Sequence, residues 1–263
     1  MPLMATTLAD SVARSLDAPI ELLPYLPELL ADLDSLGGEP DAVANLLSRL
    51  GRGEGTRALD LGCGKGAQAL VLAERFAWEV LGIDGCEPFV QEARRQAEAQ
   101  GLAGRCRFEV GDVREAAGRH AGFDVALLLG LRPVLGSLES AVGTLRACVR
   151  PGGFVVLDDG WLAAGTDSAG GDLEGFSGLN ETRRSLGAFG DEVVLEDIEA
   201  SESVLRRERE LCRSIRARAE DLARREPAIA HLARAYAARQ EGLLDLVPSG
   251  VREATWVLRI AGA

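Results

Sequence analysis

The sequence predicts an α/β fold built on a mostly parallel, doubly wound sheet with helices on both faces. Two observations carry this prediction. From residue 56 onward, short apolar segments typical of buried strands alternate with segments that have helical periodicity. The first of these strands runs directly into a turn with glycine at alternate positions, Gly62, Gly64 and Gly66, and a helical segment follows.

Composition limits the class of protein. The 263 residues are 47% hydrophobic and carry a formal net charge of −12. This is enough apolar material for a full core, and the acidic balance argues against nucleic-acid binding, which needs a basic face. No apolar run approaches the roughly 18 residues of a membrane span, and the first residues lack the pattern of a secretion signal. We therefore expect a cytoplasmic protein with no nucleic-acid or membrane partner.

The five cysteines are at positions 63, 86, 106, 148 and 212, far apart and without a CxxC pair. We expect free buried thiols, with neither disulfides nor structural zinc. Lys65 is the single lysine of the chain, and although it lies in the glycine turn we expect its side chain to be solvated.

Residues 1–50 are expected to form an N-terminal helical cap. Pro24 and Pro27 divide its leucine-rich part into short pieces, because proline lacks a backbone N–H and restricts the residue before it. A turn at Gly37 and Gly38 then precedes a helix that ends near Gly51.

The alternating part of the chain follows as a second unit, residues 51–263. Apolar runs bounded by turn residues predict strands, and 3.6-residue periodicity predicts the helices between them. In chain order the expected elements are a strand at 57–61, a helix at 67–76, a strand at 79–84, a helix at 87–100, strands at 105–110 and 123–130, a helix at 138–149, a turn at 150–153 and a strand at 154–159.

Two insertions separate the last strands. Residues 163–190 are rich in glycine, serine and aspartate and predict a variable loop with one helix near 180–189. Strands are expected at 192–200 and 254–260. Between them, the stripe of apolar residues and the proline at position 227 predict a helical hairpin over 201–243.

Acidic residues and a glycine stand where four of these strands end. Asp60 lies beside the glycine turn, Asp84 ends the second strand, Asp112 follows the third and Gly130 ends the fourth. Open α/β sheets bind ligands at the carboxyl ends of their strands. Taken alone, each aspartate could instead be a turn former or a helix cap. The spacing of the set favours a ligand site.

These features, together with the RPGG turn at 150–153, resemble the class I S-adenosylmethionine-dependent methyltransferases over roughly residues 56–162. The resemblance implies a seven-stranded sheet whose last strand is antiparallel, and S-adenosylmethionine as the cofactor. It also implies that Asp60 meets the ligand's ammonium group, that Asp84 binds the ribose and that Asp112 lies near the adenine. The implied cofactor-binding residues are Asp60, Gly62, Cys63, Gly64, Asp84, Cys86, Asp112, Val113 and Gly130.

A nicotinamide or flavin Rossmann domain is the rival interpretation, because Gly62-x-Gly64-x-x-Ala67 loosely satisfies GxGxxG/A. Asp60 before the turn, the VGD sequence after the third strand and the long helical preface argue against it. A non-catalytic protein that binds S-adenosylmethionine or its product, as a sensor or partner, is the alternative in another functional class.

Methyl transfer requires mainly in-line positioning, with at most one general base. The candidate bases are Asp158 and Asp159, expected at the end of the fifth strand. Metal-dependent catechol-type enzymes of the family carry ligands at such a pair. The fourth strand here ends without the further acid that they need, so we expect no metal.

By elimination, we expect the methyl acceptor to be a small molecule. The residues after the fourth strand match neither the Asn/Asp-Pro-Pro-aromatic signature of amino-methylating nucleic-acid enzymes nor the paired glutamates of arginine methyltransferases, and no Pro-Cys motif supplies a nucleophile for cytosine C5. The N-terminal helices and the 201–243 hairpin should close over the strand ends. The expected acceptor-binding residues are Tyr25, Arg132, Trp161 and Tyr236.

Overall fold

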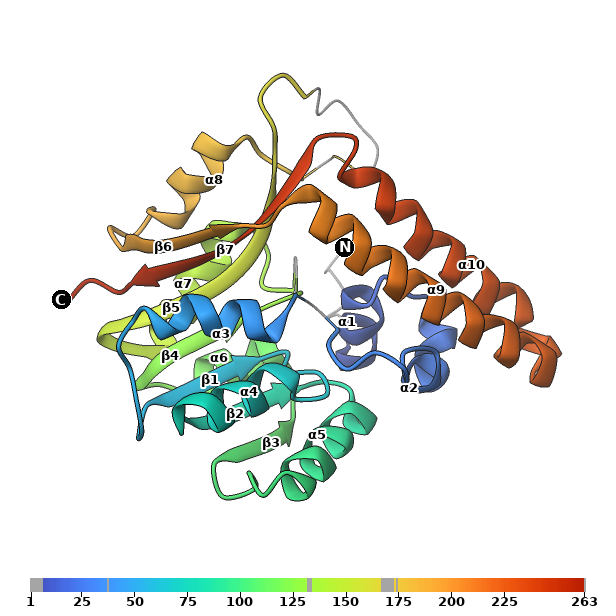
Figure 1. The fold of residues 1–263 in the computed structure, drawn as a ribbon, viewed down its shortest axis with the longest axis horizontal. Helices are drawn as coiled ribbons and strands as arrows, with labels where there is room; N and C mark the ends of the chain where they lie inside the picture. Colours follow the sequence, from blue (N-terminus) through green and yellow to red (C-terminus); the bar gives the residue numbers. More distant parts are fainter. Residues whose placement is uncertain (1–6, 37, 132–133, 167–172, 174, 263) are drawn as a thin grey trace, which may run out of the picture.

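A seven-stranded sheet is the framework of the structure, a computed structural model that describes residues 7–262 except 37, 132–133, 167–172 and 174 (Figure 1). Its strands lie in the order β3-β2-β1-β4-β5-β7-β6. The strands are β1 Arg57–Leu61, β2 Glu79–Asp84, β3 Cys106–Val110, β4 Phe123–Leu128, β5 Val149–Leu162, β6 Glu192–Ile198 and β7 Val251–Arg259. β1 to β5 pair in parallel, whereas β7 is antiparallel to both β5 and β6. The predicted fold class is confirmed.

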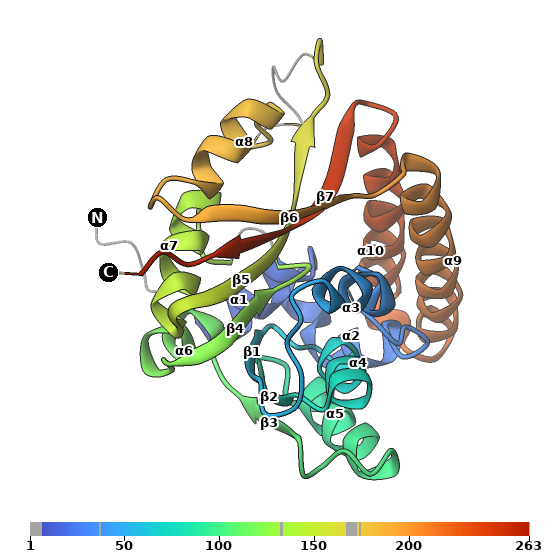
Figure 2. The ribbon, with the colours of Figure 1, turned by 60° about the vertical axis from the view of Figure 1, so that its left-hand side comes forward.

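Helices cover both faces of the sheet, as Figure 2 shows for α3 and α7. The helices outside the N-terminal part and the hairpin are α3 Pro40–Ser48, α4 Ala67–Phe76, α5 Glu87–Ala99, α6 Val113–Arg119, α7 Leu138–Cys148 and α8 Leu179–Leu186. Apolar residues of α3, α4 and α5 bury one face of the sheet, and those of α6, α7 and α8 bury the other. The strands are apolar on both sides because both of their faces are covered.

The N-terminal part and the hairpin share a third apolar cluster beyond the carboxyl ends of the strands. Its elements are α1 Leu8–Ser15, the 3₁₀ turn Ile20–Tyr25, α2 Leu26–Leu29, α9 Ser201–Arg225 and α10 Ala230–Gly242. Leu22, Leu26 and Leu29 are almost fully buried against Ile215 and Leu222 of α9. Segments some 200 residues apart therefore pack as one layer, as Figure 1 shows at α2 and α9.

Two elements differ from the sequence prediction. β5 is one strand from Val149 to Leu162, so Asp158 and Asp159 lie inside it and not at its end. The reason is β7, which pairs with β5 continuously from Phe154 to Leu162. In addition, α6 follows β3 where no helix was expected. Asp112 caps it by accepting a hydrogen bond from the Arg114 N–H at 2.9 Å.

Candidate functional site

The glycine turn after β1 is held in a conformation that glycine favours. Gly62, Gly64 and Gly66 all have positive φ, at +79°, +52° and +83°. The N–H of Gly62 donates to the carbonyl of Ile83 at 2.7 Å, which joins the turn to β2. A Cβ on Gly66 would lie 2.8 Å from the Phe108 ring. Because glycine has no side chain, a ligand can approach the backbone of this turn closely, just before the start of α4.

Asp84, at the end of β2, fixes this turn from the neighbouring strand. Its two carboxylate oxygens accept hydrogen bonds from the N–H of Gly64 at 2.9 Å and of Cys86 at 2.7 Å. Burial raises the pKa of Asp84 above its ordinary value, and these two bonds oppose that rise. Each oxygen keeps a further lone pair. Asp84 can therefore still accept hydrogen bonds from a ligand hydroxyl.

Asp60 is the most unusual group of the cleft. It alternates along β1 with Leu59 and Leu61, which face α6 and α7, so its side chain faces the α4 side of the sheet. The residue is 3% exposed and its Oδ2 has no hydrogen-bond partner among the described residues. Burial, and then the nearby charge of Asp84, raise the pKa of Asp60 to about 7. A buried acceptor without a partner indicates a site for a donor.

Asp112 differs from the other two carboxylates because it already has a partner. Its side chain forms an ion pair with Arg114, and the Arg114 Nε lies 2.9 Å from Oδ1. This pairing holds the pKa of Asp112 below its ordinary value. The N–H of the preceding Gly111 donates to the carbonyl of Asp84 at 2.9 Å. Asp112 therefore caps α6 at the rim of the cleft.

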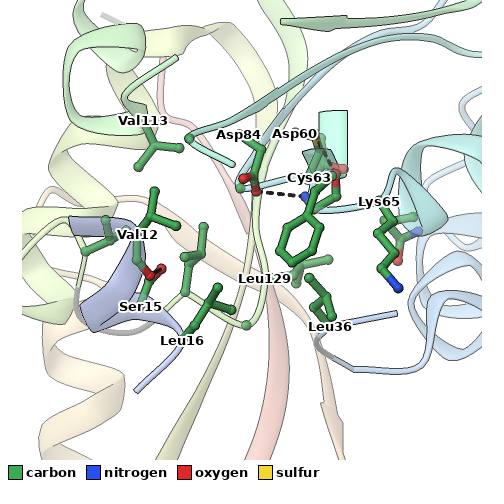
Figure 3. Close-up of a pocket in the computed structure, with 18 of the residues that line it drawn as sticks. Val12, Ser15, Leu16, Leu36, Asp60, Cys63, Lys65, Asp84, Val113 and Leu129 are labelled. Atoms are coloured by element: carbon green, nitrogen blue, oxygen red, sulfur yellow. Dashed lines mark hydrogen bonds between the residues drawn. The ribbon is translucent and has the colours of Figure 1, made fainter. Parts of the chain in front are cut away.

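These residues line one cleft, drawn in Figure 3, which also shows Asp60 beside Asp84. The structure brings together at its wall the predicted residues Asp60, Gly62, Cys63, Gly64, Asp84, Asp112, Val113 and Gly130. Cys86 does not line it: its side chain is buried with Phe89 in the cluster below the N-terminal helices. Gly85 and Phe89, next to Cys86 in the chain or on α5, line the cleft instead.

Two segments of the cleft wall were not predicted. Val12 and Ser15 belong to α1 and Leu16 follows it, and in Figure 3 all three lie across the cleft from Leu36 and Lys65. Further unpredicted lining residues are Leu8, Ser11, Asp34, Ser35, Leu129, Leu131 and Val134. A Cβ on Gly85 would lie 2.5 Å from Val12 Cγ2, so α1 packs directly on the chain just after Asp84. No motif in the sequence indicates this docking.

The Lys65 side chain was expected to be solvated, but in the structure it bonds to the protein. Its Nζ donates to the carbonyl oxygens of Leu30 at 2.6 Å, Ala31 at 3.2 Å and Leu33 at 2.6 Å. These carbonyls follow the end of α2, where backbone oxygens lack helical partners and attract a cation. Burial lowers the pKa of Lys65.

A second, polar cavity of about 450 Å³ lies between α3, β5, β6, β7 and α9, and Leu129 lines both cavities. Asp158, Thr255 and Asp197 are register partners across β5, β7 and β6 and form part of its wall. Both carboxylate oxygens of Asp158 accept from the N–H of Gly130, at 2.9 and 3.0 Å, yet burial raises its pKa to about 6. Asp158 is therefore ionised near neutral pH.

Arg207 of α9 reaches into the same cavity. It forms ion pairs with Glu199 and with Glu253, the latter at 3.3 Å. Burial raises the pKa of Glu253 to about 7 despite this partner. Asp159 points elsewhere: it is 8% exposed and accepts a hydrogen bond from the N–H of Gly160 at 2.7 Å. Of the two candidate bases, Asp158 is thus the one that lines this cavity.

The three described residues that were expected to bind the acceptor do not line either cavity. Trp161 is buried and packs on Trp256, with ring centroids 5.9 Å apart. Tyr236 is buried in the cluster between the N-terminal helices and the hairpin, and Tyr25 packs against that cluster. Arg132 lies outside the described residues. These aromatic side chains are used for packing, Trp161 in the core of the sheet and the two tyrosines in the layer of N-terminal helices and hairpin.

All five cysteines are free and buried. Within the described part of the chain, no group of three or more His, Cys, Asp or Glu side chains is arranged to hold a metal ion. None of the described helices has both the length and the apolar character to cross a membrane.

Comparison with known proteins places this geometry in context. Residues 58–153 match a family described as "Methyltransferase domain". The 23S rRNA (uracil(1939)-C(5))-methyltransferase RlmD of Xylella fastidiosa is 42% identical over 90 residues, which cover 33% of this chain and 20% of that protein. The demethylmenaquinone methyltransferase of Thermus thermophilus is 39% identical over 103 residues, covering 38% and 46%. The chain thus spans less than half the length of these relatives.

The fold is shared over most of the chain with a solved structure. A SAM-dependent methyltransferase from Thiobacillus denitrificans, in complex with S-adenosyl-L-homocysteine, superposes with a TM-score of 0.76 at 23% identity. The match covers 90% of this chain and 98% of the other. At this identity the comparison speaks for the fold.

Proposed function

We propose that this chain, which belongs to the class I S-adenosylmethionine-dependent methyltransferase family, transfers a methyl group from S-adenosylmethionine to a small molecule. The observation that carries the proposal is Asp60. Its buried Oδ2 has no partner among the described residues, and it lies in a cleft that the glycine turn also lines. A cationic ligand with an ammonium group can donate the hydrogen bond that this oxygen lacks.

In this proposal, different residues of the cleft bind different parts of the cofactor. Asp60 accepts from the ammonium of the methionine part, and the glycine turn lies beside that part. The free lone pairs of Asp84 accept from the ribose hydroxyls, and the side chain of Val113 borders the adenine end. When bound, S-adenosylmethionine supplies a methyl group on a sulfonium, which an acceptor attacks in line. The carboxylates of Asp60 and Asp84 suit the positive charge of this cofactor.

We assign the acceptor to the second cavity. Its volume of about 450 Å³ is typical of pockets for small molecules, which span roughly 300 to 1,000 Å³. It adjoins the cofactor cleft at Leu129, so an acceptor there lies next to the cofactor. Asp158 is the group that removes a proton from the acceptor, because it is ionised above about pH 6 and faces this cavity. The N–H of Gly130 orients its carboxylate.

A small acceptor is favoured over RNA, although one relative acts on rRNA. That similarity is confined to 90 residues, 33% of this chain, and the chain carries a net charge of −12. An RNA substrate would require a basic surface. The free buried thiols fit a reducing compartment, so we place the protein in the cytoplasm. In this arrangement residues 51–263 form the methyltransferase domain, α3 of the 1–50 segment packs on its sheet, and the α1–α2 part of that segment and the 201–243 hairpin close over the strand ends.

Binding and turnover test the proposal separately. Calorimetry should detect binding of S-adenosylhomocysteine and S-adenosylmethionine but not of NADH. Binding of NADH without S-adenosylhomocysteine would overturn the proposal in favour of a dinucleotide enzyme. Incubation with S-adenosylmethionine and a metabolite extract should then release S-adenosylhomocysteine. Tight binding with no release in any fraction of the extract would instead support a sensor.

A further inference from the structure

Lys65 connects the glycine turn to a segment that covers the cofactor cleft. The segment is residues 30–36, which we call the roof. Three of its carbonyl oxygens, those of Leu30, Ala31 and Leu33, accept hydrogen bonds from Lys65 Nζ at 2.6, 3.2 and 2.6 Å. Lys65 itself belongs to the turn that lies beside the cofactor. A single side chain thus joins the floor of the cleft to its roof.

The geometry argues against direct ligand binding by this ammonium group. A lysine ammonium has three N–H donors, and here three carbonyls already accept from it. It also faces the end of α2, where it compensates carbonyls that lack helical partners. Glu92, Asp34 and Asp32 surround it and favour its charged form. Lys65 is therefore engaged by the protein and not free for a ligand carboxylate.

The roof contributes directly to the cleft wall. Asp34, Ser35 and Leu36 line the cleft, and Leu36 Cδ1 lies 3.3 Å from the position that a Cβ on Gly64 would occupy. Its side chain therefore rests on the middle of the glycine turn. In Figure 3, Leu36 and Lys65 lie on the same side of the cleft. A shift of the roof would uncover the part of the turn that meets the cofactor.

The N-terminal part is also anchored to the hairpin. Asp17 and Glu28, outside the roof, form ion pairs with Arg239 and Arg225, and Asp32 of the roof pairs with Arg218. These pairs tie the N-terminal part to α9 and α10, not to the sheet, and all six side chains are at least one third exposed. The contact from the roof to the sheet made by Lys65 is of a different kind, because it reaches the ligand-binding turn itself.

We infer that Lys65 is a positioning residue for the cofactor: it fastens the roof to the glycine turn and thereby slows release of the bound adenosyl ligand. The inference rests on the proposed function, since the ligand is the one assigned there. Lys65 acts through the roof and makes no contact with the cofactor. Its loss should therefore weaken any ligand that lies under the roof, whether or not that ligand carries a carboxylate.

The test compares three variants in two assays. Lys65→Met removes all donors, Lys65→Arg keeps a cation with several donors, and Arg75→Met is the matched control. Arg75 is on α4, the helix that follows the glycine turn, and it bonds Asp41 and Asn45 of α3 and not the roof. The first assay is amide hydrogen exchange of residues 26–36 in the free protein. Exchange there should speed up about tenfold in Lys65→Met, and stay unchanged in Arg75→Met.

The second assay measures dissociation rates by stopped flow for S-adenosylhomocysteine and for 5′-methylthioadenosine, which lacks the amino-acid part. In Lys65→Met both ligands should leave about tenfold faster, and Lys65→Arg should restore most of the difference. A loss confined to S-adenosylhomocysteine would show that Lys65 binds the carboxylate directly and would overturn the inference. Unchanged rates for both ligands would overturn it as well. Failure of the wild-type protein to bind either ligand refutes the proposed function instead.

A measurement without any variant guards against misfolding of Lys65→Met. Lys65 is the only lysine of the chain, so an amine-selective reagent can modify just this side chain and the chain's α-amino group. Mass spectrometry should find Lys65 modified at least tenfold more slowly in the native protein than in urea, and more slowly still with S-adenosylhomocysteine bound. Native modification at the rate of an exposed lysine contradicts the inference.

Discussion

Replacing Asp60 by asparagine should stabilise the free protein at alkaline pH and weaken its binding of S-adenosylhomocysteine. The Asp60 side chain is buried, its Oδ2 has no partner among the described residues, and burial raises its pKa to about 7 from an ordinary value of 3.8. An ionised carboxylate in that position costs free energy in the absence of ligand. Asparagine has nearly the same shape and carries no charge.

The sign and size follow from proton linkage. An acid whose pKa is raised by folding binds more protons in the folded chain than in the unfolded chain at pH values between the two pKa values. The contribution of Asp60 to the free energy of unfolding is therefore greatest below about pH 4, falls as the pH rises, and is lowest above about pH 7. A difference of about three pKa units corresponds to about 4 kcal/mol, which is an upper limit because water can enter an open cleft.

Urea unfolding at pH 5 and pH 8.5, followed by circular dichroism, measures this effect. About two of the three pKa units fall between these pH values, so the difference in stability between Asp60→Asn and the wild-type protein should grow in favour of the variant by at most about 2.7 kcal/mol. Asp112→Asn is the control. Its pKa is lowered by Arg114, so that variant should lose stability at pH 8.5.

Asp60→Asn should also bind S-adenosylhomocysteine at least tenfold more weakly in calorimetry at pH 8, because the ligand ammonium loses a charged acceptor. A variant that is no more stable than the wild-type protein at pH 8.5 would refute the reasoning that Asp60 is a desolvated carboxylate. A variant that gains stability and keeps full affinity would refute only its role toward the ligand.

Three further substitutions test the rest of the site. Asp84→Asn should weaken S-adenosylhomocysteine binding at least tenfold in calorimetry, and unchanged affinity would remove its ribose role. In the wild-type enzyme, kcat should rise with pH through about 6 as Asp158 loses its proton. Asp158→Asn should lose this rise of kcat with pH, and Asp159→Asn should keep it. An unaltered pH dependence of kcat in Asp158→Asn would exclude Asp158 as the base. Gly66→Ala should lose at least about 2 kcal/mol in urea unfolding, because φ is +83° and the new Cβ meets Phe108. Gly101→Ala, with φ of +71° and open space, should lose only the backbone part of this.

The sequence predicts the parallel half of the sheet closely because its signals are local. Apolar runs bounded by glycine and aspartate place β1, α4 and β2 at the residues observed. The short α6 carries a local signal as well, because Asp112 with Glu115 three residues later is typical of a helix start. The length of β5, by contrast, has no local signal in the sequence. Its last residues remain in the sheet because β7, almost a hundred residues away, pairs with them.

The candidate site divides in the same way. Most of the predicted cofactor residues line one cleft because they follow parallel strands, whose carboxyl ends meet at one edge. The cleft wall formed by Val12, Ser15 and Leu36 depends on how the N-terminal helices dock, and no periodicity in residues 1–50 predicts that. Lys65 shows the same limit, since its partners are backbone carbonyls that any sequence would provide.

The second cavity, assigned to the acceptor, is formed by elements that are distant in the sequence. For this reason its lining could not be predicted from the positions of aromatic residues. Trp161 alternates along β5 with Gly160, and alternation places it in the core beside Trp256. The opposite face of the strand carries Asp158, which lines the polar cavity with Arg207 and Glu253. The cofactor cleft and this cavity meet after β4, where Leu129 lines both and the N–H of Gly130 holds Asp158. A methyl group that passes between the two sites must cross at this point, so the chain after β4 should govern which acceptor atom is reached.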